Sequence, residues 1–84
     1  MNYVIVLKAS AERDLERLPA ILHHRIVERL ASLSGVPRPR GSQKLHGVEA
    51  YRIRVGDYRI LYEVDDPRRR VTVYSIGHRR DVYR

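Results

Sequence analysis

The fold is decided by residues 51–62, which run Tyr51-Arg52-Ile53-Arg54-Val55-Gly56-Asp57-Tyr58-Arg59-Ile60-Leu61-Tyr62. Apolar and polar side chains alternate on both sides of Gly56-Asp57, and a glycine in first place of a two-residue loop favours a type II′ turn. This pattern predicts a β-hairpin. If Val55 pairs with Tyr58 to close the turn, alternation places the large apolar side chains on one face. They are Tyr51, Ile53, Val55, Tyr58, Ile60 and Tyr62.

The other face of this hairpin carries Arg52, Arg54 and Arg59. The same register sets Arg54 directly opposite Arg59, and a like-charge cross-strand pair destabilises a sheet. A bound polyanion would relieve that repulsion, since one guanidinium can hold two phosphate oxygens at once. Arginines on a strand pair are also compatible with an ordinary solvated face, so the choice depends on the rest of the chain.

Composition limits the class of protein. The 84 residues suffice for one modest core, so residues 1–84 are predicted to form a single domain. The net charge of +7 favours acidic partners such as nucleic acid or an acidic protein. The absence of cysteine excludes disulfides, thiolate nucleophiles and cysteine zinc sites, which fits a reducing compartment. The longest apolar run, Tyr3 to Leu7, is too short to span a membrane, and we expect a cytoplasmic protein with no membrane partner.

Upstream of the hairpin, the sequence predicts one strand and two helices. Residues 3–7 are apolar at every position and are expected to form a strand buried on both faces. Ser10 is expected to cap a helix that ends at Pro19. From Pro19, apolar residues at helical spacing predict a second helix to about Ser34, and an extended surface loop follows from Gly35 to Gly41.

Downstream of the hairpin, residues 71–76 predict a third strand, which Gly77 is expected to end. If Val64 pairs with Val71, Tyr74 falls on the arginine face. The element order is then one strand, a two-helix hairpin and a three-stranded antiparallel meander. This order predicts an α+β fold in which both helices cover the apolar face of a small sheet and leave the arginine face open.

Three segments of the second half are distinctive: Lys44-Leu45-His46-Gly47, the two hairpin strands, and the ending Ile76-Gly77-His78-Arg79-Arg80-Asp81-Val82-Tyr83. Together they resemble the RelE branch of the RelE/ParE toxin superfamily. The order and length of the elements agree over essentially the whole chain. The resemblance implies a toxin of a type II toxin–antitoxin pair, which cleaves messenger RNA in the ribosomal A site and is held inactive by a small antitoxin.

Position by position, the resemblance assigns the paired basic residues of the first hairpin strand to Arg52 and Arg54, where lysines are usual in the best-known members. It also implies catalytic roles for Arg59, Arg79 and Tyr83. RNA cleavage by the neighbouring 2′-OH needs a stabilised phosphorane and proton transfer at both reacting oxygens. The arginines suit stabilisation, because a guanidinium stays charged. Tyr83 is either the base, with its pKa lowered by neighbouring arginines, or a ring that stacks on a base of the message.

Other basic residues are expected to have lesser roles. Lys44, His78 and Arg80 are predicted to contact RNA, and the arginines at 68–70 are expected to belong to a solvated turn. The adjacent histidines at 23–24 point in different directions on a helix, whereas shared metal binding needs i, i+4 spacing. We therefore predict neither a metal site nor a cofactor.

Two other functions stay open from the sequence. A ParE-like toxin with the same fold would inhibit DNA gyrase without cutting RNA, although such relatives tend to lack the full set of basic residues. A non-toxic chain would survive as a component that binds an antitoxin and operator DNA. The expected partners of the nuclease are a cognate antitoxin, the ribosome and its message, with operator DNA contacted only through the antitoxin complex.

Overall fold

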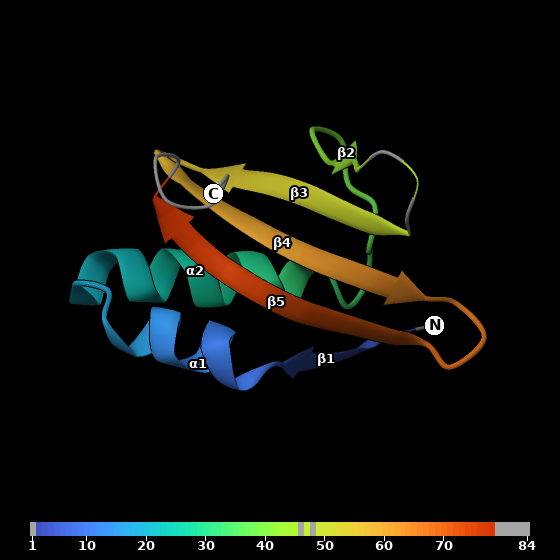
Figure 1. Cartoon of the computed structure of the whole chain (residues 1–84), viewed down its shortest axis with the longest axis horizontal. Helices are drawn as coiled ribbons and strands as arrows, with labels where there is room; N and C mark the ends of the chain where they lie inside the picture. Colours follow the sequence, from blue (N-terminus) through green and yellow to red (C-terminus); the bar gives the residue numbers. More distant parts are fainter. Residues whose placement is uncertain (1, 46, 48, 79–84) are drawn as a thin grey trace.

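The computed structural model describes residues 2–45, 47 and 49–78. Its elements follow the order β1 (Val4–Leu7), α1 (Ala9–Glu16), α2 (Ala20–Ser32), β2 (Gln43–Lys44), β3 (Ala50–Val55), β4 (Tyr58–Asp65) and β5 (Arg70–His78). The strands form one sheet in the order β1-β5-β4-β3-β2, in which β1 runs parallel to β5 and all other neighbours are antiparallel. Both helices lie on one side of this sheet (Figure 1). The predicted α+β class is confirmed.

The register of the central hairpin agrees with the prediction. Val55 pairs with Tyr58, and Arg54 pairs with Arg59. Gly56 has a φ of 60°, while Arg69 is the one non-glycine residue of the described chain with a positive φ. A positive φ at the first turn position alone is the geometry of a type II′ turn, which glycine adopts without steric cost.

The core lies between the helices and the apolar face of the sheet. It is built from Ala11, Ile26, Leu30, Leu33, Tyr51, Ile53, Val55, Ile60, Tyr62, Val64, Val71, Val73 and Ile76. Tyr62 is fully buried and donates its hydroxyl hydrogen to the carbonyl of Pro37, at 2.8 Å. This bond gives the buried phenol an acceptor and ties the loop after α2 to β4. None of the helices that the structure describes is long and apolar enough to cross a membrane.

The prediction that the first strand is buried on both faces is wrong. Val4 is 64% exposed and Val6 is 39% exposed, whereas Ile5 and Leu7 pack against the core. Val4 and Val6 lie on the face that the helices leave open. Their apolar character therefore gave a false signal of burial.

Both ends of the helical region differ from the expectation. Ser10 lies inside α1, not at its N-cap, and its hydroxyl donates to the carbonyl of Tyr74 at 2.8 Å. Lys8 occupies the N-cap position without a side-chain hydrogen bond. Pro19 directly precedes α2, and the helix ends at Ser32, short of Ser34. The hydrogen bond from Ser10 to the backbone of β5 therefore replaces the capping bond that the local sequence predicts.

The last strand is longer than expected, because Gly77 lies within β5 and does not end it. Val64 pairs with Val71 as predicted. The pairing then shifts between Leu61 and Tyr62, so that Tyr74 is the extra residue of a β-bulge. The bulge allows both Val73 and Ile76 to face the core, although three positions separate them.

Candidate functional site

The arginine face is the side of the sheet opposite the helices, where a row of residues crosses three strands. Arg54 of β3 pairs with Arg59 of β4, and Arg59 pairs in turn with Gly77 of β5. Arg54 is exposed and Arg59 is half-buried. Since Gly77 has no side chain, the row places two guanidinium-bearing residues beside a position without steric bulk.

A small cavity of about 90 Å³ lies at the turn end of this row and is lined by Arg54, Gly56, Asp57 and Arg59. No ion pair joins Asp57 to either arginine in the described part of the chain. Arg54 and Arg59 therefore bring like charges to the lining of one hollow. A phosphate would neutralise both, and guanidinium groups suit two-point contacts with its oxygens.

Arg52 of β3 lies on the arginine face beside β2, a strand that the sequence pattern did not predict. It pairs with Gln43 of β2 and donates a hydrogen bond to the Gln43 side-chain oxygen. A two-residue strand is too short to show alternation, so Gln43 gave no signal in the sequence. Its position helps to fix the Arg52 side chain.

Lys44 does not lie with the arginines. It pairs with Tyr51, whose side chain belongs to the helix-covered face, and its ammonium lies 3.1 Å from the Glu49 carboxylate. The Lys44 ammonium holds the pKa of Glu49 below its usual range. The predicted RNA contact of Lys44 would thus have to form outside the arginine face.

His78 also faces away from the arginines. It pairs with Tyr58 and meets that ring edge-on, with 5.7 Å between the ring centroids. Together with Asp14 of α1 and Arg17 at the C-cap of that helix, both residues line a cavity of about 380 Å³. The other predicted site residues, Arg79, Arg80 and Tyr83, lie outside the described residues.

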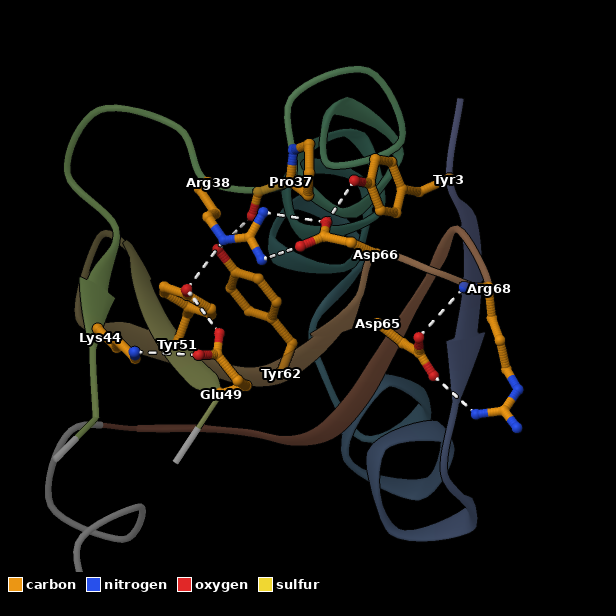
Figure 2. Close-up of polar contacts among 10 residues, drawn as sticks. All are labelled: Tyr3, Pro37, Arg38, Lys44, Glu49, Tyr51, Tyr62, Asp65, Asp66 and Arg68. Atoms are coloured by element: carbon orange, nitrogen blue, oxygen red, sulfur yellow. Dashed lines mark hydrogen bonds and ion pairs between the residues drawn. The ribbon is translucent and has the colours of Figure 1, made fainter. Parts of the chain in front are cut away.

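A polar network that no sequence pattern predicted lies at the opposite end of the sheet. Figure 2 shows the Arg38 guanidinium between two partners: its Nε donates to the Tyr51 hydroxyl and one terminal nitrogen to the Asp66 carboxylate, both at 2.8 Å. Tyr3 also donates to Asp66. These hydrogen bonds, led by those of Arg38, lower the pKa of Asp66. Hydrogen bonds thus connect a loop arginine and a turn aspartate that are distant in sequence.

The arginine face carries three guanidinium groups, those of Arg52, Arg54 and Arg59, on neighbouring strands. Within the residues that the structure describes, no three His, Cys, Asp or Glu side chains gather in a way that could hold a metal ion. The chemistry available on this face is electrostatic stabilisation by permanently charged groups.

Comparison with known proteins gives a consistent result along the whole chain. The family described as "ParE toxin of type II toxin-antitoxin system" matches residues 5–83. The chain is 34% identical to Toxin RelG of Mycobacterium tuberculosis over 88 aligned positions, covering 100% of this chain and 99% of the relative. It is also 34% identical to Toxin RelE of the same organism, covering 98% of this chain and 87% of the relative.

Solved structures agree with these matches. The toxin–antitoxin complex RelBE2 of M. tuberculosis contains a chain that superimposes with a TM-score of 0.83 at 30% identity, covering 93% of this chain and 99% of that one. The archaeal RelE–RelB complex of Pyrococcus horikoshii gives 0.82 at 25% identity, with 98% and 100% covered. The isolated RelE toxin of E. coli gives 0.80 at 25% identity, with 90% and 83% covered.

Proposed function

The chain belongs to the family of ParE toxins of type II toxin–antitoxin systems, and from this premise we propose that it is a ribosome-dependent endoribonuclease that cleaves messenger RNA in the A site. The proposal treats residues 1–84 as one toxin domain acting in the cytoplasm. The RelE type is favoured because both curated relatives that cover the chain are toxins named RelG and RelE.

The observation that carries the proposal is the Arg54–Arg59 pair on the open sheet face. This pairing is unfavourable for the isolated fold, because like charges directly opposite each other destabilise a sheet. It becomes favourable when a phosphate binds between the two guanidinium groups. Arg52 lies two positions along β3 on the same face. We therefore propose that the three arginines bind one phosphodiester.

In the proposed reaction the 2′-hydroxyl of the message loses its proton, its oxygen attacks the adjacent phosphorus, and the 5′-oxygen leaves and takes up a proton from water. Arg52, Arg54 and Arg59 stabilise the charge that develops on the phosphorane oxygens. Arg79 is proposed to act at the same phosphate. Tyr83 acts at the reacting nucleotide, where the phenol can accept the 2′ proton or the ring can stack on a base. Because this set lacks a strong acid or base, free RNA should be cut poorly.

The same family assignment supports a protein partner. The toxins in the similar complexes from M. tuberculosis and P. horikoshii are bound to their antitoxins. We propose a cognate antitoxin for this chain as well, which inhibits by covering the arginine face and the segment that carries Tyr83. Operator DNA would be contacted only through that complex. A complex structure that leaves the arginine face uncovered would refute this mode of inhibition.

The experiment that tests the nuclease is cleavage of a defined message in purified ribosome complexes with an empty A site, with free message as control. Wild type should cut the ribosome-bound message, and Arg54→Gln should lose at least about a hundredfold in kcat, as expected when one group that stabilises the transition state is removed. Arg13→Gln, an exposed position on α1, removes the same charge and should retain activity. Arg54→Gln should unfold no earlier than wild type in urea, since it removes a repulsive pair.

Inhibition of DNA gyrase is the second candidate, and the family description as ParE toxin is the observation that favours it. A protein that arrests growth, inhibits gyrase supercoiling and leaves ribosome-bound message intact would establish it. A chain that neither arrests growth nor cuts message would instead be the non-toxic component.

If the protein does cut message, comparing Tyr83→Phe with wild type distinguishes a role of the Tyr83 hydroxyl from a role of its ring.

A further inference from the structure

The β3–β4 turn connects the arginine face to a second basic surface on α2. A shallow hollow of about 400 Å³ lies between this helix and the end of β3. Its lining consists of Arg25, Glu28, Arg29 and Ser32 from α2, with Arg54, Val55 and Gly56 from the hairpin. The four helical residues follow i, i+3, i+4, i+7 spacing, which places them on one face of the helix. The hollow is thus formed by one helix face and one turn.

Among the described residues, no carboxylate forms an ion pair with the cations of this hollow. Arg25, Arg29 and Arg54 take part in no ion pair in the described part of the chain, whereas Arg38 and Arg68 are held by Asp66 and Asp65. The one acid in the lining, Glu28, lies 3.6 Å from His24. Three arginines and one carboxylate leave the lining with a net positive charge, which favours an anion from outside.

Arg54 lines both this hollow and the small cavity that contains Arg59. Positive charge therefore continues from the open sheet face, around the turn, onto α2. We propose that Arg25 and Arg29 bind the sugar–phosphate backbone of RNA outside the reacting nucleotide, as an accessory site that anchors the toxin on its substrate complex. This inference rests on the proposed function and extends it to a surface beyond the three arginines that are proposed to bind the reacting phosphodiester.

Phosphate fits this hollow better than an acidic protein segment does. Stable protein interfaces need a buried apolar anchor, and the one large apolar side chain of the lining, Val55, is only 8% exposed. Arginine side chains around a shallow, polar depression instead match the sequence-independent backbone contacts of nucleic-acid-binding proteins. The source of the phosphates is either the ribosomal RNA or the message next to the cleaved codon.

The test compares Arg25→Ala/Arg29→Ala with the matched pair Arg13→Ala/Arg40→Ala. Both double variants remove two positive charges from exposed or half-buried positions, and the control residues line neither hollow. We expect KM for the ribosome complex to rise roughly tenfold in the first variant, as for two exposed charge contacts, with kcat unchanged. The slope of log KM against log salt should become shallower by about 1.5, since each lost phosphate contact contributes about 0.7 to 0.9. The control should keep the wild-type values.

Hydroxyl-radical footprints identify the source of the phosphates. Protection of ribosomal RNA that disappears in Arg25→Ala/Arg29→Ala assigns the site to the ribosome, and loss of protection only on the message assigns it to the substrate strand. An unchanged KM and salt slope would overturn the proposal. A weaker affinity for the antitoxin with an unchanged KM would overturn it in favour of a protein-docking surface.

Failure of the proposed function has a different signature. If wild type cuts no message, the nuclease proposal falls, and sedimentation of the toxin with ribosomes still tests the α2 site. Wild-type binding that weakens only in Arg25→Ala/Arg29→Ala supports the accessory site. Equal binding by both double variants refutes it.

Discussion

At the scale of single residues, the arginines of this chain fall into two groups according to the residues that they contact. Arg38 is bound to the Tyr51 hydroxyl and the Asp66 carboxylate, and Arg68 lies 3.2 Å from Asp65. Arg54 faces Arg59 and takes part in no ion pair among the described residues. The first two hold loops in place, whereas the charge of Arg54 is directed at solvent. Composition could not separate these roles, because the partners of Arg38 lie far from it in the sequence.

The Asp66 carboxylate should make the fold sensitive to acid. Hydrogen bonds from Arg38 and Tyr3 lower its pKa in the folded state, so the unfolded chain binds more protons as pH falls below about 4. The stabilisation is therefore present above that pH and is lost as pH falls through the folded-state pKa. In urea unfolding between pH 2 and 7, Asp66→Asn should be less stable than wild type at neutral pH and should lose less stability on acidification.

Glu16→Gln is the matched control, because Glu16 lies exposed on α1 with no hydrogen bond or ion pair of its side chain among the described residues. Its stability should follow the wild-type pH profile. An Asp66→Asn profile parallel to wild type at every pH would show that the Arg38 contacts contribute nothing to folding.

At the scale of elements, β1 and then α1 form hydrogen bonds to successive backbone groups along the edge of β5. The strand ladder ends where the Lys8 N–H donates to the Val73 carbonyl, at 2.9 Å. Beyond that point, Ser10 donates to the carbonyl of Tyr74 and Asp14 accepts the N–H of Ile76 at 3.0 Å. Spacing of i, i+4 sets both side chains on the same helix face. The sequence indicated a capping role for Ser10, and only the packing of α1 on β5 could reveal its actual partner.

Loss of the Asp14 contact should loosen the end of β5, which leads directly into Arg79. In Asp14→Ala, amide hydrogen exchange at Ile76 should accelerate by about fivefold, equivalent to roughly 1 kcal/mol for a partly exposed hydrogen bond. Asp14→Asn keeps an acceptor oxygen and should exchange more slowly than the alanine variant. Glu16→Ala, an exposed change on the same helix, should leave Ile76 at the wild-type rate. Equal exchange in Asp14→Ala and wild type would mean that β5 holds its end without α1.

At the scale of the whole molecule, the sheet has one structural face and one open face. The alternation in residues 51–62 was enough to predict the hairpin register, the core positions of β3 and β4, and the side on which the helices pack. It could not predict β2, which is too short to show alternation, or the bulge at Tyr74, which interrupts the alternation of β5. The exposed side of β1 could not be predicted either, because its partner strand β5 lies at the other end of the chain. Candidate phosphate contacts followed from the same alternation, whereas the basic hollow on α2 required the tertiary packing.

Two valines test this division of the faces. Val73 is fully buried in β5 on the helix-covered face, and Val4 is 64% exposed in β1 on the open face. Val73→Ala should lower the free energy of unfolding by roughly 2 kcal/mol, from two lost methyl groups and the cavity left behind. Val4→Ala should change it by less than about 0.5 kcal/mol, as for an exposed position. Urea unfolding monitored by far-UV circular dichroism measures both. A large loss in Val4→Ala would mean that another surface covers β1 in solution, since its outer face would then be buried after all.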